Sequence, residues 1–309
     1  MLTNIFIFIV ALFMVIKGAT MATKYAAPLA KRIGLSEYTV GFIIIAIISI
    51  LPETFISISS SLKGIPSFGL AMLLGSNVAD LTLIFAAIIF FTGKDLKVES
   101  KILKNHIIYP LLLILPLVLG LNGHFSRLEG VVLILAGGLF YYMSFKNGEK
   151  RTMPLNTEKD THKNLFMLLF SMAVLLAGSH FTVSSASALA YAFGVTPVLV
   201  GMLVVGLGTT MPEFFFALKS IKGTDDSLAI GDILGTVLAD ATIVVGILAL
   251  VNPFSFPQSI VYVTGIFMVL ASFILFHFMR TGRDISKREG YILFIFWICF
   301  VFIEFFLNK

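Results

Sequence analysis

Hydrophobic residues along the 309-residue chain gather in long runs separated by short polar segments. Most runs reach or approach the roughly 20 residues that a helix needs to cross a bilayer. They lack the alternation of apolar and polar positions typical of barrel strands, the other structure that satisfies its backbone in lipid. The pattern therefore predicts an all-α membrane protein with ten transmembrane helices. The expected spans are residues 1–23, 37–62, 67–92, 105–122, 128–145, 164–192, 196–222, 227–252, 258–280 and 289–308.

Composition agrees with this class and excludes a water-soluble fold. Hydrophobic residues make up 58% of the chain and charged residues 13%, whereas soluble domains carry about 25% charged residues. The net charge of +5 does not indicate a nucleic-acid partner, because the basic residues lie in the short segments between spans. Membrane lipid is the expected surrounding partner, and we expect the monomer to be the functional unit.

The basic residues also predict an orientation in the cell membrane. If the amino terminus lies outside, eighteen Lys and Arg residues fall in cytoplasmic segments, against Lys63, Arg127 and Lys309 outside. An excess of Lys and Arg in cytoplasmic loops is the known topological rule. The most polar segment, residues 146–164, then lies in the cytoplasm and is expected to link a first half, 1–145, to a second half, 165–309.

An internal repeat relates these two halves. A shift of 160 residues aligns VGFIIIAIISILPETF at 40–55 with VGMLVVGLGTTMPEFF at 200–215, and SFGLAMLLGSNVAD at 67–80 with SLAIGDILGTVLAD at 227–240. Because each half has five spans, the second enters the membrane from the opposite side. Inverted repeats of this kind are typical of secondary transporters, whose substrate site lies near the midplane of the bilayer.

The repeat places acidic residues deep inside the expected spans. Glu53 and Asp80 in the first half correspond to Glu213 and Asp240 in the second. A carboxylate at such depth costs several kcal/mol (~2.5–3.5 on insertion scales) unless it meets a cation, a proton or a polar cavity, so these four acids predict a transport site. Structural pairing of the acids with polar neighbours is the alternative interpretation.

Other oxygen atoms are expected around the acids. A proline inside a helix frees the carbonyl four residues before it, which here belongs to Ile48 and to Gly208. Hydroxyl and carboxyl groups recur at helical spacing beside the four acids, with no thiol or imidazole among them, and this chemistry suits a hard cation such as calcium better than magnesium. The further candidate metal-binding residues are Ser49, Ser76, Thr209, Thr210 and Thr236, with Asp232, Asn77, Gly206 and Ile48 as accessory candidates.

Four ionised acids would outweigh the two charges of one calcium ion. Monovalent cations or protons must therefore share the site, which favours exchange of one cation load for another over leakage. The expected ligands are thus Ca²⁺ and either Na⁺ or H⁺, with no resident cofactor.

The motifs Leu51-Pro52-Glu53, Gly208 to Glu213, Gly75 to Asp80 and Gly231 to Asp240 resemble the two α-repeats of the cation/calcium exchanger superfamily, most closely those of prokaryotic sodium/calcium exchangers. The resemblance implies that spans two, three, seven and eight form the ion-binding core, across which spans one and six slide. It implies that Glu53 and Glu213 are the central calcium ligands and that Asp80 and Asp240 flank them. Thr210, Ser76 and Glu213 would form an outer sodium site, and Thr209 would offer its backbone carbonyl.

This chain departs from the family pattern in the first repeat. Ile48, Ser49 and Ile50 stand where Gly-Thr-Ser is usual, so the sodium site expected beside Glu53 and Thr236 loses a hydroxyl. Asp80 replaces what is commonly Asn. These changes make proton-coupled exchange of calcium or another divalent cation the alternative to sodium coupling, although the Gly-Asn-x-x-Glu signature of the proton-coupled branch is absent from both halves.

Two other functional classes compete with an exchanger. An intramembrane aspartyl protease also uses two carboxylates in different spans, but its usual Gly-x-Gly-Asp motif is matched here only by Ala229-Ile230-Gly231-Asp232. A cation channel needs similar oxygen atoms, yet inverted repeats with broken helices favour alternating access. The sequence therefore predicts a secondary-active antiporter and no enzymatic activity.

Overall fold

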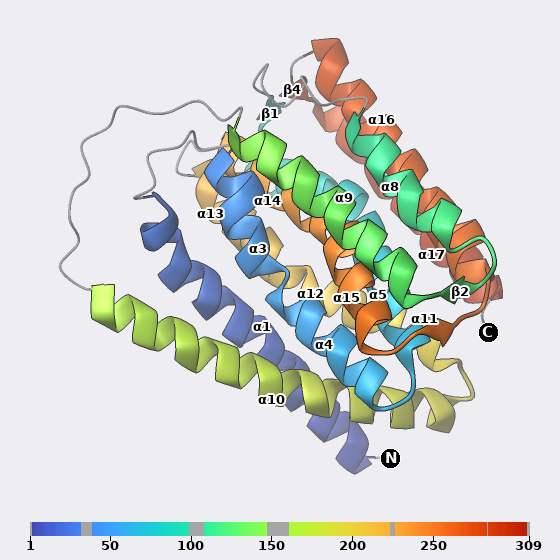
Figure 1. The fold of residues 1–309 in the computed structure, drawn as a ribbon. Helices are drawn as coiled ribbons and strands as arrows, with labels where there is room; N and C mark the ends of the chain where they lie inside the picture. The colour runs from blue at the N-terminus through green and yellow to red at the C-terminus, as the bar shows by residue number, and fades with distance from the viewer. Residues whose placement is uncertain are drawn as a thin grey trace.

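The computed structural model describes residues 2–31, 39–98, 108–146, 161–222, 226–282 and 284–307, and these residues are almost entirely helical (Figure 1). Two shorter apolar helices, Ala46–Leu62 and Ile108–Leu119, occupy the expected second and fourth spans, whose first residues lie outside the described ranges. An all-helical membrane protein is thus confirmed, while the count of ten spans stays a prediction. Eight described helices are long and apolar enough to cross a membrane: Leu2–Ala22, Pro66–Thr92, Arg127–Lys146, Lys163–Phe193, Pro197–Lys222, Asp226–Val251, Ile260–Thr281 and Lys287–Leu307.

The elements recur along the chain with a spacing close to 160 residues; α9, for example, begins at Arg127 and α17 at Lys287. The first set, in which η denotes a π-helical segment, is α1 (Leu2–Lys31), η1 (Val40–Ile45), α3 (Ala46–Ser49), α4 (Leu51–Leu62), α5 (Pro66–Ala79), η2 (Asp80–Ile84), α6 (Phe85–Thr92), β1 (Leu96–Lys97), α8 (Ile108–Leu119), β2 (His124–Phe125) and α9 (Arg127–Lys146). The second set is α10 (Thr161–Phe193), α11 (Pro197–Val200), η3 (Gly201–Val205), α12 (Gly206–Thr209), α13 (Met211–Lys222), α14 (Asp226–Ala239), η4 (Asp240–Val244), α15 (Val245–Val251), β3 (Phe254–Ser255), η5 (Ile260–Gly265), α16 (Ile266–Gly282), β4 (Asp284–Ile285) and α17 (Lys287–Leu307).

Two spans are broken at equivalent positions. Helix α3 ends at Ser49 and α4 restarts at Leu51, and the same interruption separates α12 from α13 at Thr210. The sequence explains the break, because a proline is tolerated in the first turn of a helix but not in its interior. Pro52 and Pro212 each lie in the first turn of the new helix. The expected disruption of both spans by proline is therefore present, as a stop and a restart of the helix.

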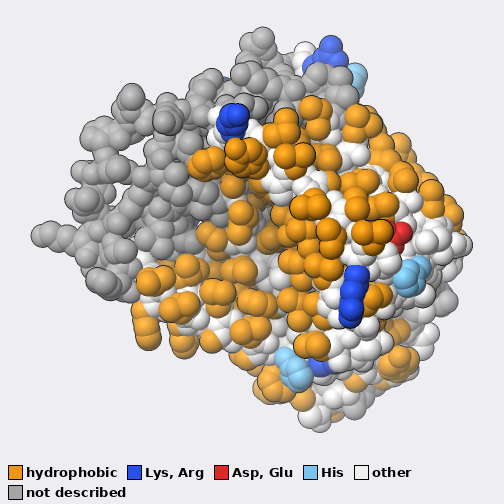
Figure 2. All heavy atoms as spheres, in the orientation of Figure 1, with side chains coloured by type: hydrophobic (Ala, Val, Ile, Leu, Met, Phe, Trp, Pro, Cys, Tyr) orange, Lys and Arg blue, Asp and Glu red, His pale blue; other side chains and the backbone are white. Residues whose placement is uncertain are grey.

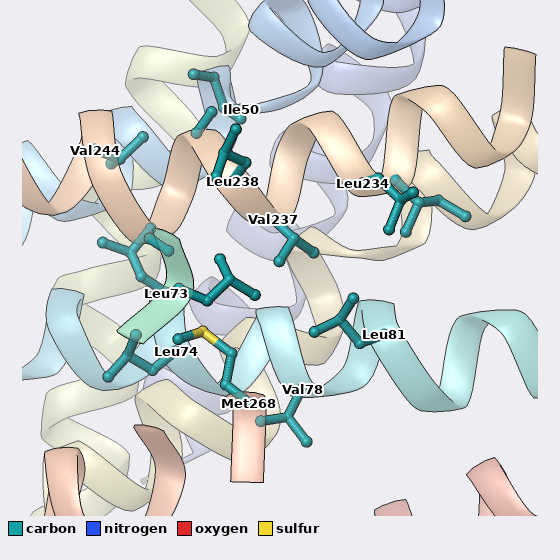
Figure 3. Packing of buried hydrophobic residues seen from close by; sticks show 14 of the residues in the cluster. Ile50, Leu73, Leu74, Val78, Leu81, Leu234, Val237, Leu238, Val244 and Met268 are labelled. Carbon is teal, nitrogen blue, oxygen red and sulfur yellow. The ribbon is translucent and has the colours of Figure 1, made fainter. Parts of the chain in front are cut away.

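The core lies where α5 and α14 cross, since these two helices and their π-helical continuations are the most completely buried spans in the described chain. Figure 3 shows Leu73 of α5 and Val237 of α14 in the packed region between the two helices, while Val78 lies beside Met268 and Leu238 beside Ile50. Helices α1 and α10 pack against each other along one side of the bundle (Figure 1). Among the described residues on the face shown in Figure 2, hydrophobic side chains predominate and few are charged, as expected for a surface that contacts lipid.

The two sets of elements exchange contacts across the core. The π-helical segment η1 packs against α14, and η3 packs against α5. Glycines permit the close approach: a Cβ atom on Gly75 would lie 2.8 Å from the Met202 carbonyl oxygen, and one on Gly235 would collide with the Phe42 carbonyl oxygen. These two contacts are equivalent under the 160-residue shift.

Asn77 and the residue 160 positions later also touch each other. The Asn77 side-chain amide donates to the Val237 carbonyl oxygen at 3.2 Å. The two sets therefore meet at equivalent positions of α5 and α14.

Two short antiparallel ladders, which the helical pattern did not predict, join loops from the two sets. Strand β1 pairs with β4 through Leu96 and Ile285, and β2 pairs with β3 through His124 and Ser255. The β1–β4 ladder lies at one end of the bundle and β2 toward the other (Figure 1). Each ladder thus ties a loop of the first half to a loop of the second.

Candidate cation-binding site

The helix breaks and the π-helical segments place the four acids expected from the repeat. Glu53 lies in the first turn of α4 and Glu213 in the first turn of α13, where the helix dipole favours negative charge. Asp80 begins η2 and Asp240 begins η4, directly after the central helices. All four side chains are at most 1% exposed. The acids are therefore inside the protein and face neither lipid nor water.

These acids form one electrostatic cluster, and Asp232 of α14 belongs to it. Glu213 interacts electrostatically with Glu53, Asp80 and Asp232, and Asp240 interacts with Glu53 and Asp80. The sequence placed Asp232 only among the accessory candidates. Five buried carboxyl groups that interact electrostatically cannot all carry charge without nearby cations, because like charges repel strongly in a medium of low dielectric.

Many oxygen atoms of the cluster have no hydrogen-bond partner. Such atoms are rare in folded proteins, because a buried polar group without a partner costs about 1–3 kcal/mol, and more when it is charged. Their concentration at one place indicates that these oxygens serve a ligand. The unpartnered atoms are Glu53 Oε2, Asp80 Oδ1, Glu213 Oε1 and Oε2, Asp232 Oδ2, Thr236 Oγ1, Asp240 Oδ1 and Oδ2, and Asn77 Oδ1.

Hydroxyl groups beside the acids form hydrogen bonds within their own helices. Thr210 donates to the Leu207 carbonyl and Ser76 to that of Leu73, each at 3.0 Å, while the Thr209 hydroxyl contacts the Gly206 carbonyl at 3.0 Å and also forms a hydrogen bond with Glu53. A hydroxyl whose hydrogen is already donated keeps its oxygen lone pairs as acceptors. These side chains can therefore offer oxygen to a cation.

Ser49 makes a different contact, which crosses between the two halves. Its hydroxyl donates to Asp232 Oδ1 at 2.9 Å. Ser49 thus fixes one oxygen of Asp232 and leaves Oδ2 without a partner. This contact joins α3 to α14 at the edge of the cluster.

The remaining accessory candidates, Gly206 and Ile48, lie in the helices beside the cluster. The Gly206 carbonyl accepts the Thr210 amide at 3.2 Å in addition to the Thr209 hydroxyl. A Cβ atom on Gly206 would lie 3.2 Å from the Ser76 amide nitrogen, so glycine lets α12 approach α5. Ile48 is half-buried on α3, one residue before Ser49.

The carboxyl groups alone do not form a closed set of metal ligands. In the part of the chain that the structure describes, no three side chains among His, Cys, Asp and Glu are placed to hold one metal ion together. A hard cation in this arrangement would therefore combine one or two carboxylates with hydroxyl, amide and carbonyl oxygens. Calcium accepts six to eight such oxygens in flexible geometry, so the donor set fits calcium.

A sixth buried acid, Glu304 of α17, was not singled out from the sequence. It is fully buried, and Thr264 of η5 donates to its Oε1 at 2.5 Å. The sequence did contain a feature that could have identified it, because Glu304 is the only acidic residue in the apolar run from 290 to 307. Its lack of a counterpart in the repeat, where Ser144 occupies the equivalent position, explains why the comparison of halves missed it.

Helices broken beside a buried cluster of carboxylates define a membrane transporter of cations. The chain belongs to the sodium/calcium exchanger family, whose model, described as sodium/calcium exchanger protein, matches residues 3–146 and 163–306. The family resemblance expected from the paired motifs is confirmed. Members of this family are transporters, so the prediction of no enzymatic activity is confirmed and the aspartyl protease alternative is wrong.

Relatives of nearly equal length support this assignment. The chain is 24% identical to sodium/calcium exchanger MaX1 of Methanosarcina acetivorans, over 98% of this chain and 99% of that protein. It is 26% identical to the putative antiporter CaxA of Alkalimonas amylolytica, over 96% and 97%. The solved structure of the sodium-calcium exchanger NCX_Mj has the same fold, with a TM-score of 0.73 and 21% identity over 96% of this chain and 97% of that one.

Proposed function

We propose that the protein exchanges Ca²⁺ for Na⁺ across the cell membrane by alternating access. The single observation that carries this proposal is the group of buried, unpartnered carboxylate oxygens where the two halves meet. Cations neutralise such a group, and a site that cannot remain empty and charged favours exchange over net release. The name of the relative MaX1, a sodium/calcium exchanger, agrees with this choice of ions.

In this proposal Glu53 and Glu213 are the central calcium ligands. Their two charges balance one calcium ion, and both lie in the first turn of a helix that restarts after a break. Thr209 supplies a carbonyl, while Ser76 and Thr210 join Glu213 in an outer sodium site. Asp80, Asp240 and Thr236 complete the polar surroundings, and Asp232 is held at the edge by Ser49.

The proposed architecture is two inverted five-helix halves, residues 1–145 and 165–309, joined by the linker 146–164. The 160-residue spacing of the elements and the contact between Asn77 and Val237 support a two-fold relation between the halves. Strands β1 and β3 hold corresponding places in the two sets, yet their ladders lie at opposite ends of the bundle (Figure 1). This arrangement supports an inverted relation between the halves. We propose that the amino terminus is outside, that the linker is cytoplasmic and that the monomer is the working unit.

Proton coupling is the second candidate, and two residues favour it. Asp80 adds an ionisable group to the cluster, and Ile50 occupies the first break, where Thr210 supplies a hydroxyl in the other half. An additional acid and one hydroxyl fewer shift the balance from sodium ligands toward groups that bind protons. Transport driven by a proton gradient alone would establish this second function.

The test is radiolabelled calcium uptake by proteoliposomes under separate sodium and proton gradients. We expect uptake with an outward sodium gradient, and its loss in Glu53→Gln and in Glu213→Gln. Glu304→Gln is the matched control, because it removes a buried carboxylate outside the proposed site. Uptake that persists in both site variants, or that needs no counter-ion, contradicts the proposal.

A further inference from the structure

A basic cavity lies beside the β1–β4 ladder, away from the carboxylate cluster. Its volume is about 700 Å³, and its lining includes Lys94, Lys97, Lys287 and Arg288 together with Asp95 and Asp284. The first half contributes the segment after α6, and the second half contributes the segment before α17. Both halves therefore build this cavity, at the end of the bundle where β1 and β4 are seen in Figure 1.

Two of the acidic residues near the cavity, Asp95 and Asp284, line it together with the four cationic side chains and offset two of the four positive charges. Asp95 accepts the backbone amide of Lys287 at 3.1 Å, and Asp226 accepts that of Lys97 at 3.1 Å. Glu289 caps its own helix through the Ser286 amide at 2.7 Å. Within the described ranges, none of the four cationic side chains forms an ion pair through its charged group. The described lining thus keeps a net charge of +2, from four cationic side chains against two carboxylates.

The fold itself does not require this charge. Under the 160-residue shift, the positions of Lys94, Lys97 and Arg288 correspond to Phe254, Pro257 and Leu128 at the other ladder, and only Lys287 keeps a basic counterpart, Arg127. Lys287 and Arg288 also begin α17, where the helix dipole disfavours positive charge. The rule that cytoplasmic loops are rich in Lys and Arg accounts for basic residues in these loops, but it does not require four of them around one cavity.

The surface next to the cavity is apolar and aromatic. Phe91 in the last turn of α6 is 73% exposed and Tyr291 in the first turns of α17 is 60% exposed. The rings of Phe90 and Tyr291 lie 4.8 Å apart. Aromatic side chains of this kind are enriched at the level of lipid headgroups. A ligand here meets positive charge in the cavity and a lipid-facing surface beside it.

We propose that this cavity binds the phosphate headgroup of an anionic membrane lipid, whose acyl chains lie along the aromatic surface of α6 and α17. Lysine and arginine suit phosphate, and arginine can donate two parallel hydrogen bonds to it. Basic pockets between transmembrane helices are suited to anionic headgroups. The aromatic surface favours a lipid over free phosphate. The lipid joins a loop of each half and so supports the β1–β4 ladder.

The test is lipid binding by the full-length protein, measured by native mass spectrometry and by thermal stability. Phosphatidylglycerol is compared with phosphatidylcholine and with inorganic phosphate. The affinity of the variant Lys287→Gln/Arg288→Gln for phosphatidylglycerol is expected to fall by at least about tenfold. The matched control, Lys219→Gln/Lys222→Gln, removes two exposed charges from the end of α13 and should bind as the wild type does.

Selective binding of phosphatidylglycerol that is lost only in the cavity variant supports the proposal. Equal losses in both variants would show a general surface-charge effect and overturn it. Equal stabilisation by inorganic phosphate would show a free-anion site and overturn the choice of a lipid. Lys94→Gln/Lys97→Gln provides a second cavity variant, and the melting of each variant in phosphatidylcholine checks its folding.

Discussion

Replacing Glu213 with glutamine should stabilise the protein without calcium and remove its response to calcium. Both carboxylate oxygens of Glu213 are buried and have no hydrogen-bond partner. The side chain also faces electrostatic repulsion from Glu53, Asp80 and Asp232. Glutamine has nearly the same shape and carries no charge. The substitution therefore relieves repulsion and desolvation in the absence of a cation, and it removes a central ligand in its presence.

Two opposite effects are expected. The glutamine amide is still a buried polar group without a partner, so the substitution relieves only the extra cost of burying a charge, on the order of 1–3 kcal/mol. Wild-type protein should gain about 2.7 kcal/mol at a calcium concentration 100 times its Kd, because a ligand that binds only the folded state stabilises it by RT ln(1 + [L]/Kd). The variant should gain essentially none of this. The order of the two melting temperatures should thus differ between calcium-free and calcium-saturated samples.

The assay is thermal unfolding in detergent, with a chelator and then with saturating calcium. Glu304→Gln is the matched control, because Glu304 is equally buried but has the Thr264 hydroxyl as a partner. This control should show no gain in stability without calcium and should keep the calcium response. A Glu213→Gln protein that calcium still stabilises by the wild-type amount would refute the assignment of Glu213 as a ligand.

Two further substitutions test other parts of the structure. Asp80→Asn should change the dependence of calcium uptake on sodium and on pH while uptake continues, because it removes one charge from the cluster and keeps the side chain's shape; identical profiles would contradict this. Gly75→Ala should lower the free energy of unfolding by about 1–3 kcal/mol, because its Cβ would lie 2.8 Å from the Met202 carbonyl oxygen. Gly138→Ala, where a Cβ meets no atom within 4 Å, is its control in chemical denaturation, and equal effects would argue against the close contact.

Much of the fold was predictable, because hydrophobic run length is a strong signal for a membrane helix. The expected span at 128–145 corresponds to α9, Arg127–Lys146, and the expected break at each proline is present. The π-helical segments were not predictable, since no side-chain pattern marks the extra residue in a helical turn. The two ladders were also missed, because each has only two residues per strand.

The candidate site was predictable in its acids and less so in its contacts. Glu53 and Glu213 stood out because a carboxylate inside an apolar run is costly. The hydrogen bond from Ser49 to Asp232 spans 183 residues, and no local pattern encodes a pairing at that separation. Asn77 remains an accessory candidate through its unpartnered Oδ1, but the hydrogen bond from its amide group to Val237 was not foreseen. Such pairings depend on how helices cross, which a one-dimensional pattern does not contain.

The ladders have a consequence for how the chain matures during synthesis. Strands β1 and β2 leave the ribosome long before their partners β4 and β3. The amino-terminal portion must therefore wait in the membrane with unpaired loop segments until translation is nearly complete. Truncated products should remain open to degradation, and separately produced portions should recover stability only when both are present.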